Sequence, residues 1–223
     1  HWAKAAVLGP FARLGGQGMP RAVTRARIHR SAQGLHVRVV CDEPRMDQLA
    51  MSHTGRDADV WKDDCVEVFV ANPRLQPYAH FTVNPTATRF DEQGRDAAWN
   101  ADWQAKATLG KTSWTMDLTF PWPALGGQPK PGETWRLNVC RSRRPVAELA
   151  CWAPTGSGFH VPDRFGFLRF GDEPVPTALS WHLPSPIQGE VHSTWSPTTP
   201  VPALTVNGRP AGKGFAIEQD GDV

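Results

Sequence analysis

The chain has 223 residues, with 24 lysines and arginines against 22 aspartates and glutamates, which gives a net charge of +2 at pH 7. A chain of this length can bury a hydrophobic core without needing disulfides or metals to fold. The balanced charge argues against a nucleic-acid groove, and no apolar run approaches the ~18 residues that cross a bilayer. We therefore expect neither nucleic acid nor a membrane as a partner.

The predicted elements alternate with the period of two that is typical of strands. "PWPALGG" (121–127) is at best one short turn, and no window has the apolar stripe of a helix. Without crossover helices, a parallel α/β sheet is excluded. The pattern predicts an all-β fold, an antiparallel β-sandwich of the jelly-roll or immunoglobulin-like kind with about ten strands. In chain order, the predicted strands are 24–30, 35–43, 65–70, 79–85, 87–92, 103–109, 113–120, 134–142, 149–154 and 165–170.

The composition changes near residue 171, which we take as the end of the sandwich domain (1–171). Residues 172–202 are rich in Pro, Ser and Thr, and this predicts a linker or an extended arm on the sandwich. Residues 203–223 predict a short hairpin around Asn207-Gly208. The hairpin either packs back on the sandwich or starts a further domain, and we favour the second interpretation.

The ten tryptophans stand against a single tyrosine. Tryptophan has the largest flat apolar face of any side chain, so the excess favours a stacking site in addition to the core. The spacing of the four cysteines matches no zinc-binding motif. The sequence leaves two alternatives for them, buried thiols or disulfides; they are Cys41, Cys65, Cys140 and Cys151. Most tryptophans are expected in the core, among them Trp99, Trp103, Trp114, Trp122, Trp135 and Trp152.

Catalysis finds no support in the sequence, and we expect a module that is not an enzyme. Asp63 and Glu67 share a strand face but lie ~13 Å apart along it, too far for the paired carboxylates of a glycosidase. No Ser or Cys occupies a nucleophile elbow, and no helical His pair predicts a zinc protease.

Glu67 lies in the middle of an apolar strand, on the same face as Cys65 and Phe69. That face is either a solvated sheet surface or the floor of a site that needs a carboxylate and an aromatic wall. A sugar ring needs a flat aromatic for its C–H face and polar groups for its hydroxyls. Trp61 before the strand and Phe159 in a Gly-rich loop are the candidate aromatic faces.

Six segments in this order resemble the family 9 carbohydrate-binding modules and related DOMON-type sandwiches, over about residues 2 to 170. The resemblance implies that two aromatics clamp a sugar at a chain end while polar side chains bind its hydroxyls. The segments are "VWKDDCVEVFV", "YAHFTVNPTATRFDE", "WNADWQAKA", "WTMDLTFPWPALG", "PGETWRLNVCRSR" and "WAPTGSGFHVPDRFGFLRF".

By the same resemblance, Trp61 matches the first clamp tryptophan and Glu67 the hydroxyl-binding acid. Thr82 and Asn84 fall where the family has an arginine and an asparagine, and Phe159 falls at the second clamp tryptophan. The chain departs from the family at Thr82 and Phe159, and again where Gly156 replaces a polar residue. Arg89, His160 or Arg141 are candidates to replace the lost donor.

The resemblance also implies partners and a location. We expect a carbohydrate ligand, neighbouring domains in the same polypeptide, and a secreted, periplasmic or cell-surface location. Family members bind structural calcium, which the acidic loops 57–64 and 91–102 could hold through oxygen ligands.

Two alternatives remain open. One is an electron-transfer sandwich that binds haem through Met and His ligands, for which Met46, Met51, His53, His80 and His160 are available. The other is a structural domain that supports an attached enzyme and binds no sugar.

Overall fold

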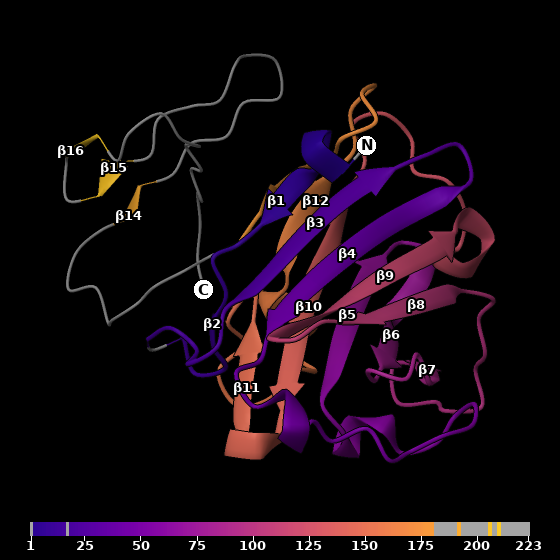
Figure 1. Ribbon diagram of the computed structural model, residues 1–223. Coiled ribbons are helices and arrows are strands. Elements are labelled where there is room, and N and C mark those ends of the chain that lie inside the picture. The colour runs from indigo at the N-terminus through magenta and orange to yellow at the C-terminus, as the bar shows by residue number, and fades with distance from the viewer. Residues whose placement is uncertain (1, 17, 181–190, 193–204, 207–208, 211–223) are drawn as a thin grey trace. The chain divides into compact units, whose positions relative to one another are not determined.

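The computed structural model describes the chain except residues 1, 17, 181–190, 193–204, 207–208 and 211–223 (Figure 1). The chain divides into two units, residues 1–184 and 185–223. In the second unit, Val191–His192 (β14), Thr205–Val206 (β15) and Arg209–Pro210 (β16) pair antiparallel. The β15–β16 pairing spans the predicted Asn-Gly turn, and the rest of the predicted hairpin lies outside the described residues.

The first unit is an antiparallel β-sandwich, as predicted, with one five-stranded and one eight-stranded sheet (Figure 1). The five-stranded sheet has the order β1–β3–β4–β9–β8. Its strands are Ala6–Leu8 (β1), Thr24–Arg30 (β3), Gly34–Asp42 (β4), Gln104–Leu109 (β8) and Ser113–Pro121 (β9).

The eight-stranded sheet has the order β13–β12–β10–β5–β6–β7, with β11 beside β10 and β2 beside β11. Its central strands β5 and β6 follow each other in the chain, and β10 returns from much later to pair with β5. The strands are Ala12–Arg13 (β2), Cys65–Asn72 (β5), Leu75–Val83 (β6), Arg89–Gln93 (β7), Thr134–Arg143 (β10), Glu148–Cys151 (β11), Gly166–Arg169 (β12) and Thr177–Leu179 (β13).

All ten predicted strands are present with small shifts at their ends, and the sequence missed only the short strands β1, β2 and β13 in this unit. Strand β13 lies inside the segment predicted as a linker or arm, where Thr177–Leu179 pair with β12. The predicted turn at 121–127 contains a 3₁₀ turn, Trp122–Leu125 (η4). In the described part of the chain, no helix is long and apolar enough to cross a bilayer.

The core lies between the two sheets and is built from the inward residues of both. Trp103, Trp114 and Trp135 are buried there as predicted, whereas Trp99 is half-buried and packs against the edge of the core. The four cysteines are buried free thiols, and burial raises the pKa of Cys41 to about 12. Burial likewise raises the pKa of Cys65 and of Cys140, whereas the hydrogen bond from Cys140 lowers the pKa of Cys151.

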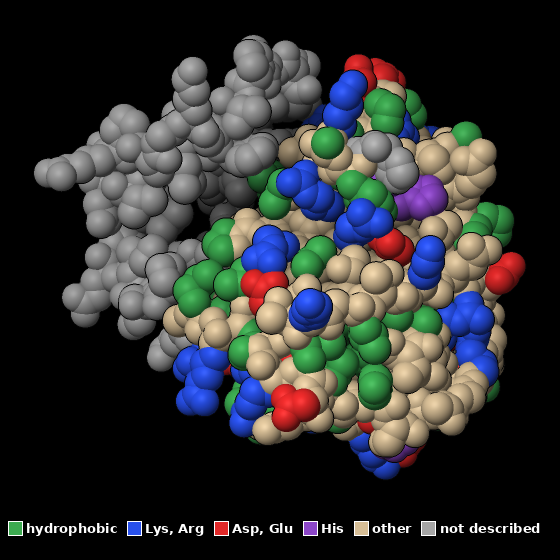
Figure 2. All heavy atoms as spheres, in the orientation of Figure 1, with side chains coloured by type: hydrophobic (Ala, Val, Ile, Leu, Met, Phe, Trp, Pro, Cys, Tyr) green, Lys and Arg blue, Asp and Glu red, His purple; other side chains and the backbone are tan. Residues whose placement is uncertain are grey.

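Figure 2 shows one side of the molecule, with basic, acidic and apolar side chains interspersed. On the five-stranded sheet, two arginines are paired with acids of neighbouring strands, Arg25 with Asp42 and Arg38 with Asp117. The five-stranded sheet therefore presents a mixed surface here, in agreement with the balanced net charge.

A buried ion cluster links the two sheets at one end of the core. Glu43, which follows β4, is fully buried and accepts hydrogen bonds from Arg143 (2.5 and 2.7 Å) and Arg141 (3.3 Å) of β10. Burial by itself raises the pKa of Glu43, but the hydrogen bonds from Arg143 and Arg45 lower it overall. The cluster thus holds one carboxylate against two buried guanidinium groups.

Removing this carboxylate leaves Arg141 without its ion-pair partner and leaves Arg143 with only the longer contact to Glu148 (3.8 Å). We expect Glu43→Gln to lower the free energy of unfolding by about 3–5 kcal/mol in urea denaturation at pH 7. Arg25→Gln, which removes an exposed partner of an ion pair, serves as the control and is expected to cost less than about 1 kcal/mol. Equal losses in the two variants would contradict this account of the cluster.

Candidate functional site

The candidate site lies on the outer face of the eight-stranded sheet, the face turned away from the five-stranded sheet. Inward residues of β5 such as Val66, Val68 and Val70 belong to the core, so Glu67 and Phe69 point outward. In register, Glu67 lies beside Thr82 and Cys140, and Phe69 lies beside His80. Two adjacent rows of outward side chains therefore cross the sheet at Glu67 and Phe69.

His80 lies between two carboxylates on this face. Its Nε2–H donates to Oε2 of Glu67 at 2.9 Å, and its Nδ1–H donates to Oε1 of Glu92 at 3.0 Å. The other oxygen of Glu67, Oε1, accepts from Oγ of Ser142 at 3.2 Å. Glu67, His80 and Glu92 are all buried, so this charged chain is shielded from water.

The pKa shifts of Glu67, His80 and Glu92 have the same origin, the hydrogen bonds and charges that the three groups share, which outweigh the effect of burial. Burial by itself lowers the pKa of His80, but the hydrogen bonds and charges of Glu67 and Glu92 raise it overall. Burial likewise raises the pKa of Glu67 and of Glu92, and the hydrogen bond from His80 reverses this, so both are lowered. We infer that His80 is an imidazolium between the two carboxylates. Glu67, His80 and Glu92 are buried and together carry a net charge of −1.

The face beside His80 is covered by a second apolar cluster, which includes Phe69, Tyr78, Phe159 and Phe165. Phe159 is only 8% exposed and packs on Phe69 with ring centroids 6.5 Å apart. From the Gly-rich loop, Phe159 was predicted to offer an aromatic face, and the structure corrects this because the loop folds down on the sheet. Phe159 therefore offers no open face to a sugar, and the predicted two-ring clamp is not formed.

His160, the next residue, reaches the polar chain instead. Its ring packs edge-on against Phe69 and His80, with centroid distances of 5.0 and 4.7 Å. Its Nδ1 lies 3.0 Å from the hydroxyl of Tyr78 and 3.8 Å from Oε1 of Glu92. Burial and the nearby charge of His80 lower the pKa of His160 to about 4, so this imidazole is neutral.

Trp61 lies at the other end of the same row of rings. It belongs to the 3₁₀ turn Val60–Lys62 (η3) and packs edge-on against Phe90 of β7, with centroids 4.8 Å apart. Trp61 is 36% exposed and is the only aromatic side chain in the exposed class among the described residues. Its carbonyl accepts a hydrogen bond from Arg144, which fixes the turn. An exposed indole on an anchored turn is a suitable stacking surface.

Asp63 anchors the turn that carries Trp61. Its carboxylate accepts from the backbone N–H groups of Ser52 (3.1 Å) and His53 (3.0 Å) and from Nδ2 of Asn84 (2.8 Å). Burial raises the pKa of Asp63, but these hydrogen bonds and that of the His53 ring lower it overall. Asn84 also accepts from the backbone of Thr88 at 3.0 Å, so its amide is used to shape the loop. Asn84 is thus committed to structure, not free for a ligand.

The remaining predicted residues are divided between the two faces. Thr82 lies on the outer face, with Oγ1 2.8 Å from Nε2 of His80. Arg89 pairs with Val83, a core residue, and donates to the carbonyl of Trp103, so it is turned away from Glu67. Arg141 is buried against Glu43 in the sandwich core. Neither arginine replaces the family's arginine beside Glu67.

The acidic loops proposed for calcium direct their carboxylates to protein donors. Asp64 accepts from the backbone of Ala50 at 2.8 Å, and Asp91 accepts from Arg56 and from the backbone of Ala101. The haem alternative needs a methionine beside a histidine. Met46 instead packs against the core, and Met51 is exposed.

We did not predict from the sequence that the centre of this face is formed by His80, Glu92, Tyr78 and Ser142. The signal was available for His80 and Tyr78, because they lie two and four residues from Thr82 on the same strand and therefore share its face. Glu92 and Ser142 come from β7 and β10, and only the register of these strands brings them beside Glu67 and His80.

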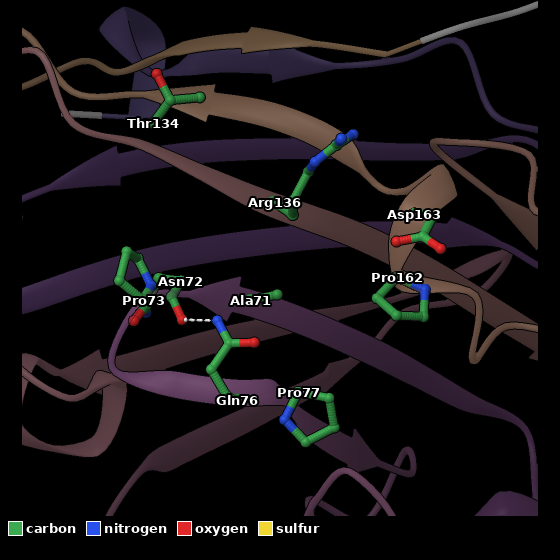
Figure 3. A pocket seen from close by; sticks show the side chains of 9 residues that line it. All are labelled: Ala71, Asn72, Pro73, Gln76, Pro77, Thr134, Arg136, Pro162 and Asp163. Atoms are coloured by element: carbon green, nitrogen blue, oxygen red, sulfur yellow. Dashed lines mark hydrogen bonds between the residues drawn. The ribbon is translucent and has the colours of Figure 1, made fainter. Parts of the chain in front are cut away.

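A hollow of about 410 Å³ lies farther along the same sheet, beyond Phe69. Figure 3 shows Arg136 and Asp163 along one part of its wall, with Gln76 and Pro77 along another. The lining contains no aromatic ring, so this hollow lacks a stacking face. Its lining residues are Ala71, Asn72, Pro73, Gln76, Pro77, Thr134, Arg136, Pro162 and Asp163.

In a comparison of whole structures, the fold of the sandwich is similar to that of carbohydrate-binding modules. A family 9 module from Caldicellulosiruptor kristjanssonii in complex with glucose matches with a TM-score of 0.56 and 13% identity, covering 77% of this chain and 87% of that module. Its complex with cellotriose gives 0.57 and 13%, covering 77% and 85%. A candidate carbohydrate-binding protein from Bacteroides uniformis gives 0.57 and 19%, covering 72% and 86%.

No family model and no curated protein matches the sequence. At these identities the comparison establishes the fold that the resemblance implied, a family 9-like β-sandwich. The ligand of this chain has to be argued from its own residues.

The anchoring of Trp61 through Asp63 predicts a pH-dependent stability. The pKa of Asp63 in the folded chain is below its usual 3.8. The contribution of Asp63 to the free energy of unfolding is therefore complete above about pH 5, and it is lost as the pH falls through the pKa of the folded state. We expect Asp63→Asn to lower the free energy of unfolding by about 1–3 kcal/mol at pH 7, and by less near pH 3.

Urea denaturation of both proteins at the two pH values checks this. Asp47→Asn, at an exposed acid, is the control and is expected to be neutral at both. If Asp63→Asn lowers the free energy of unfolding by the same amount at both pH values, the charge of the carboxylate is not what anchors the turn.

Proposed function

We propose that this chain is a non-catalytic carbohydrate-binding module that stacks one sugar ring on Trp61. The observation that carries the proposal is the exposed indole itself, fixed by Phe90, Arg144 and the η3 turn. A large apolar ring held in water costs free energy unless a ligand covers it. The fold shared with modules bound to glucose and cellotriose supports a sugar as that ligand.

Polar side chains belong to the same turn as Trp61. Lys62 and Asp59, which flank Trp61 in the sequence, form an exposed ion pair, and Arg144 donates to the backbone carbonyl of Trp61. We infer that these side chains supply donors and acceptors for the hydroxyls of a stacked sugar.

The proposal has a single stacking surface because Phe159 is packed into the apolar cluster. Sugar binding by one ring is weaker than by a clamp, so we place the module in a longer secreted or surface protein, where a second site adds avidity. Catalysis has no support here, because Glu67 and Glu92 both bind His80 and neither is free to act as an acid or base.

Calorimetric titration with glucose, cellotriose and a panel of other sugars tests the proposal. We expect Trp61→Ala to weaken binding by at least about 1 kcal/mol, or about fivefold in Kd, because the stacking face is lost. Trp2→Ala is the matched control and should leave Kd unchanged, because this half-buried indole belongs to the 3₁₀ turn Trp2–Lys4 (η1) and packs on His29 of β3.

A second variant separates the single surface from the clamp. Phe159→Leu keeps the apolar packing and should change Kd by less than about twofold. If Phe159→Leu weakens binding as much as Trp61→Ala, the loop opens to form a clamp after all. If the native chain binds no sugar at millimolar concentration, the supporting-domain alternative replaces this proposal.

A further inference from the structure

Glu67, His80 and His160 form a cluster of metal-ligating side chains on the outer face of the eight-stranded sheet. Each offers one ligand atom, and the three atoms lie within 4.8 Å of one another. The residues come from β5, from β6 and from the loop that ends in Pro162–Arg164 (η6), so three separate segments converge on one point. Two imidazoles and one carboxylate are a donor set that suits zinc.

We propose that Glu67, His80 and His160 bind a divalent transition-metal ion of the Zn²⁺ class, with one coordination position left for water or a ligand. The inference does not depend on sugar binding at Trp61, because none of its three ligands belongs to the stacking surface.

The ligand atoms of Glu67 and His80 are already close, whereas the three ligand atoms together span up to 4.8 Å, so the His160 ring has to move toward the other two. Oε2 of Glu67 and Nε2 of His80 are 2.9 Å apart, joined through one proton. Two ligands of a tetrahedral zinc ion with bonds of 2.0–2.1 Å lie about 3.3 Å apart. Small side-chain rotations therefore allow the ion to replace the shared proton, which is released to solvent.

The groups around the three ligands are arranged as they are in metal sites. Glu92 accepts from Nδ1–H of His80 and so directs Nε2 toward Glu67, which is the carboxylate–histidine–metal arrangement. Ser142 donates to Oε1 of Glu67 and leaves Oε2 for the ion. The Tyr78 hydroxyl fixes the ring of His160 at 3.0 Å.

The charge of the site also favours a cation. Glu67 and Glu92 carry two negative charges against the single positive charge of His80, all buried. Nδ1 of His160 contacts the Tyr78 hydroxyl, so Nε2 is the ring nitrogen that is available to an ion. The side chain of His160 is 18% exposed, which gives an ion access from solvent. A divalent ion that displaces one proton changes the net charge of the set from −1 to zero.

Isothermal titration of the full chain with ZnCl₂, after dialysis against a chelator, tests this inference. We expect 1:1 binding that weakens by roughly 100-fold or more in His160→Ala and by about 10–100-fold in Glu92→Gln, whose side chain only orients His80. His36→Gln is the matched control, because His36 is a half-buried histidine of the five-stranded sheet. It should leave the affinity unchanged.

Co²⁺ is the second probe, because its visible spectrum reports tetrahedral coordination directly. We expect intense visible bands from the native chain that are absent from His160→Ala, while circular dichroism without metal shows that both proteins are folded. No 1:1 binding by the native chain, or equal binding by His160→Ala, would overturn the proposal. Sugar titrations carried out in chelator keep the two proposals separate, since each can fail while the other holds.

Discussion

The buried charge of Glu67 is the constraint on which the outer face of the eight-stranded sheet depends. A carboxylate in the middle of an apolar strand is costly to desolvate, and the chain compensates through His80 and Ser142. His80 in turn requires Glu92 on β7. The register of β10, β5, β6 and β7 is thereby tied to one polar chain, because a slip of one residue would leave a charge unpaired.

This polar chain divides the face into two parts with different character. On one side the loop carrying Phe159 and His160 folds down and seals an apolar cluster. On the other side the η3 turn holds Trp61 outward, through hydrogen bonds that end on Asp63 and Arg144. One end of the row of rings is thus closed and the other is open, so the sandwich can offer an indole to a ligand without exposing its acids.

The sequence predicted the sandwich well because period-two alternation reports which side chains enter the core, as in β9 and in β4 from Leu35 onward, where buried and partly exposed residues alternate. It predicted less of the site because a site depends on register between strands. Glu67 and Trp61 were named from their places in the sequence and Thr82 from the family resemblance, whereas Glu92 and Ser142 meet His80 and Glu67 only through pairings distant in sequence. Phe159 was misplaced because a Gly-rich loop does not reveal whether it stands open or folds down.

Histidine nitrogen NMR at neutral pH measures the charge of His80 directly, because it reports the protons on each ring nitrogen. We expect His80 to carry protons on both Nδ1 and Nε2 in the metal-free chain, each in a hydrogen bond to a carboxylate. His160 should be neutral in the same spectrum. A neutral His80 with one protonated nitrogen would contradict the imidazolium between Glu67 and Glu92, and with it the explanation for an acid in this strand.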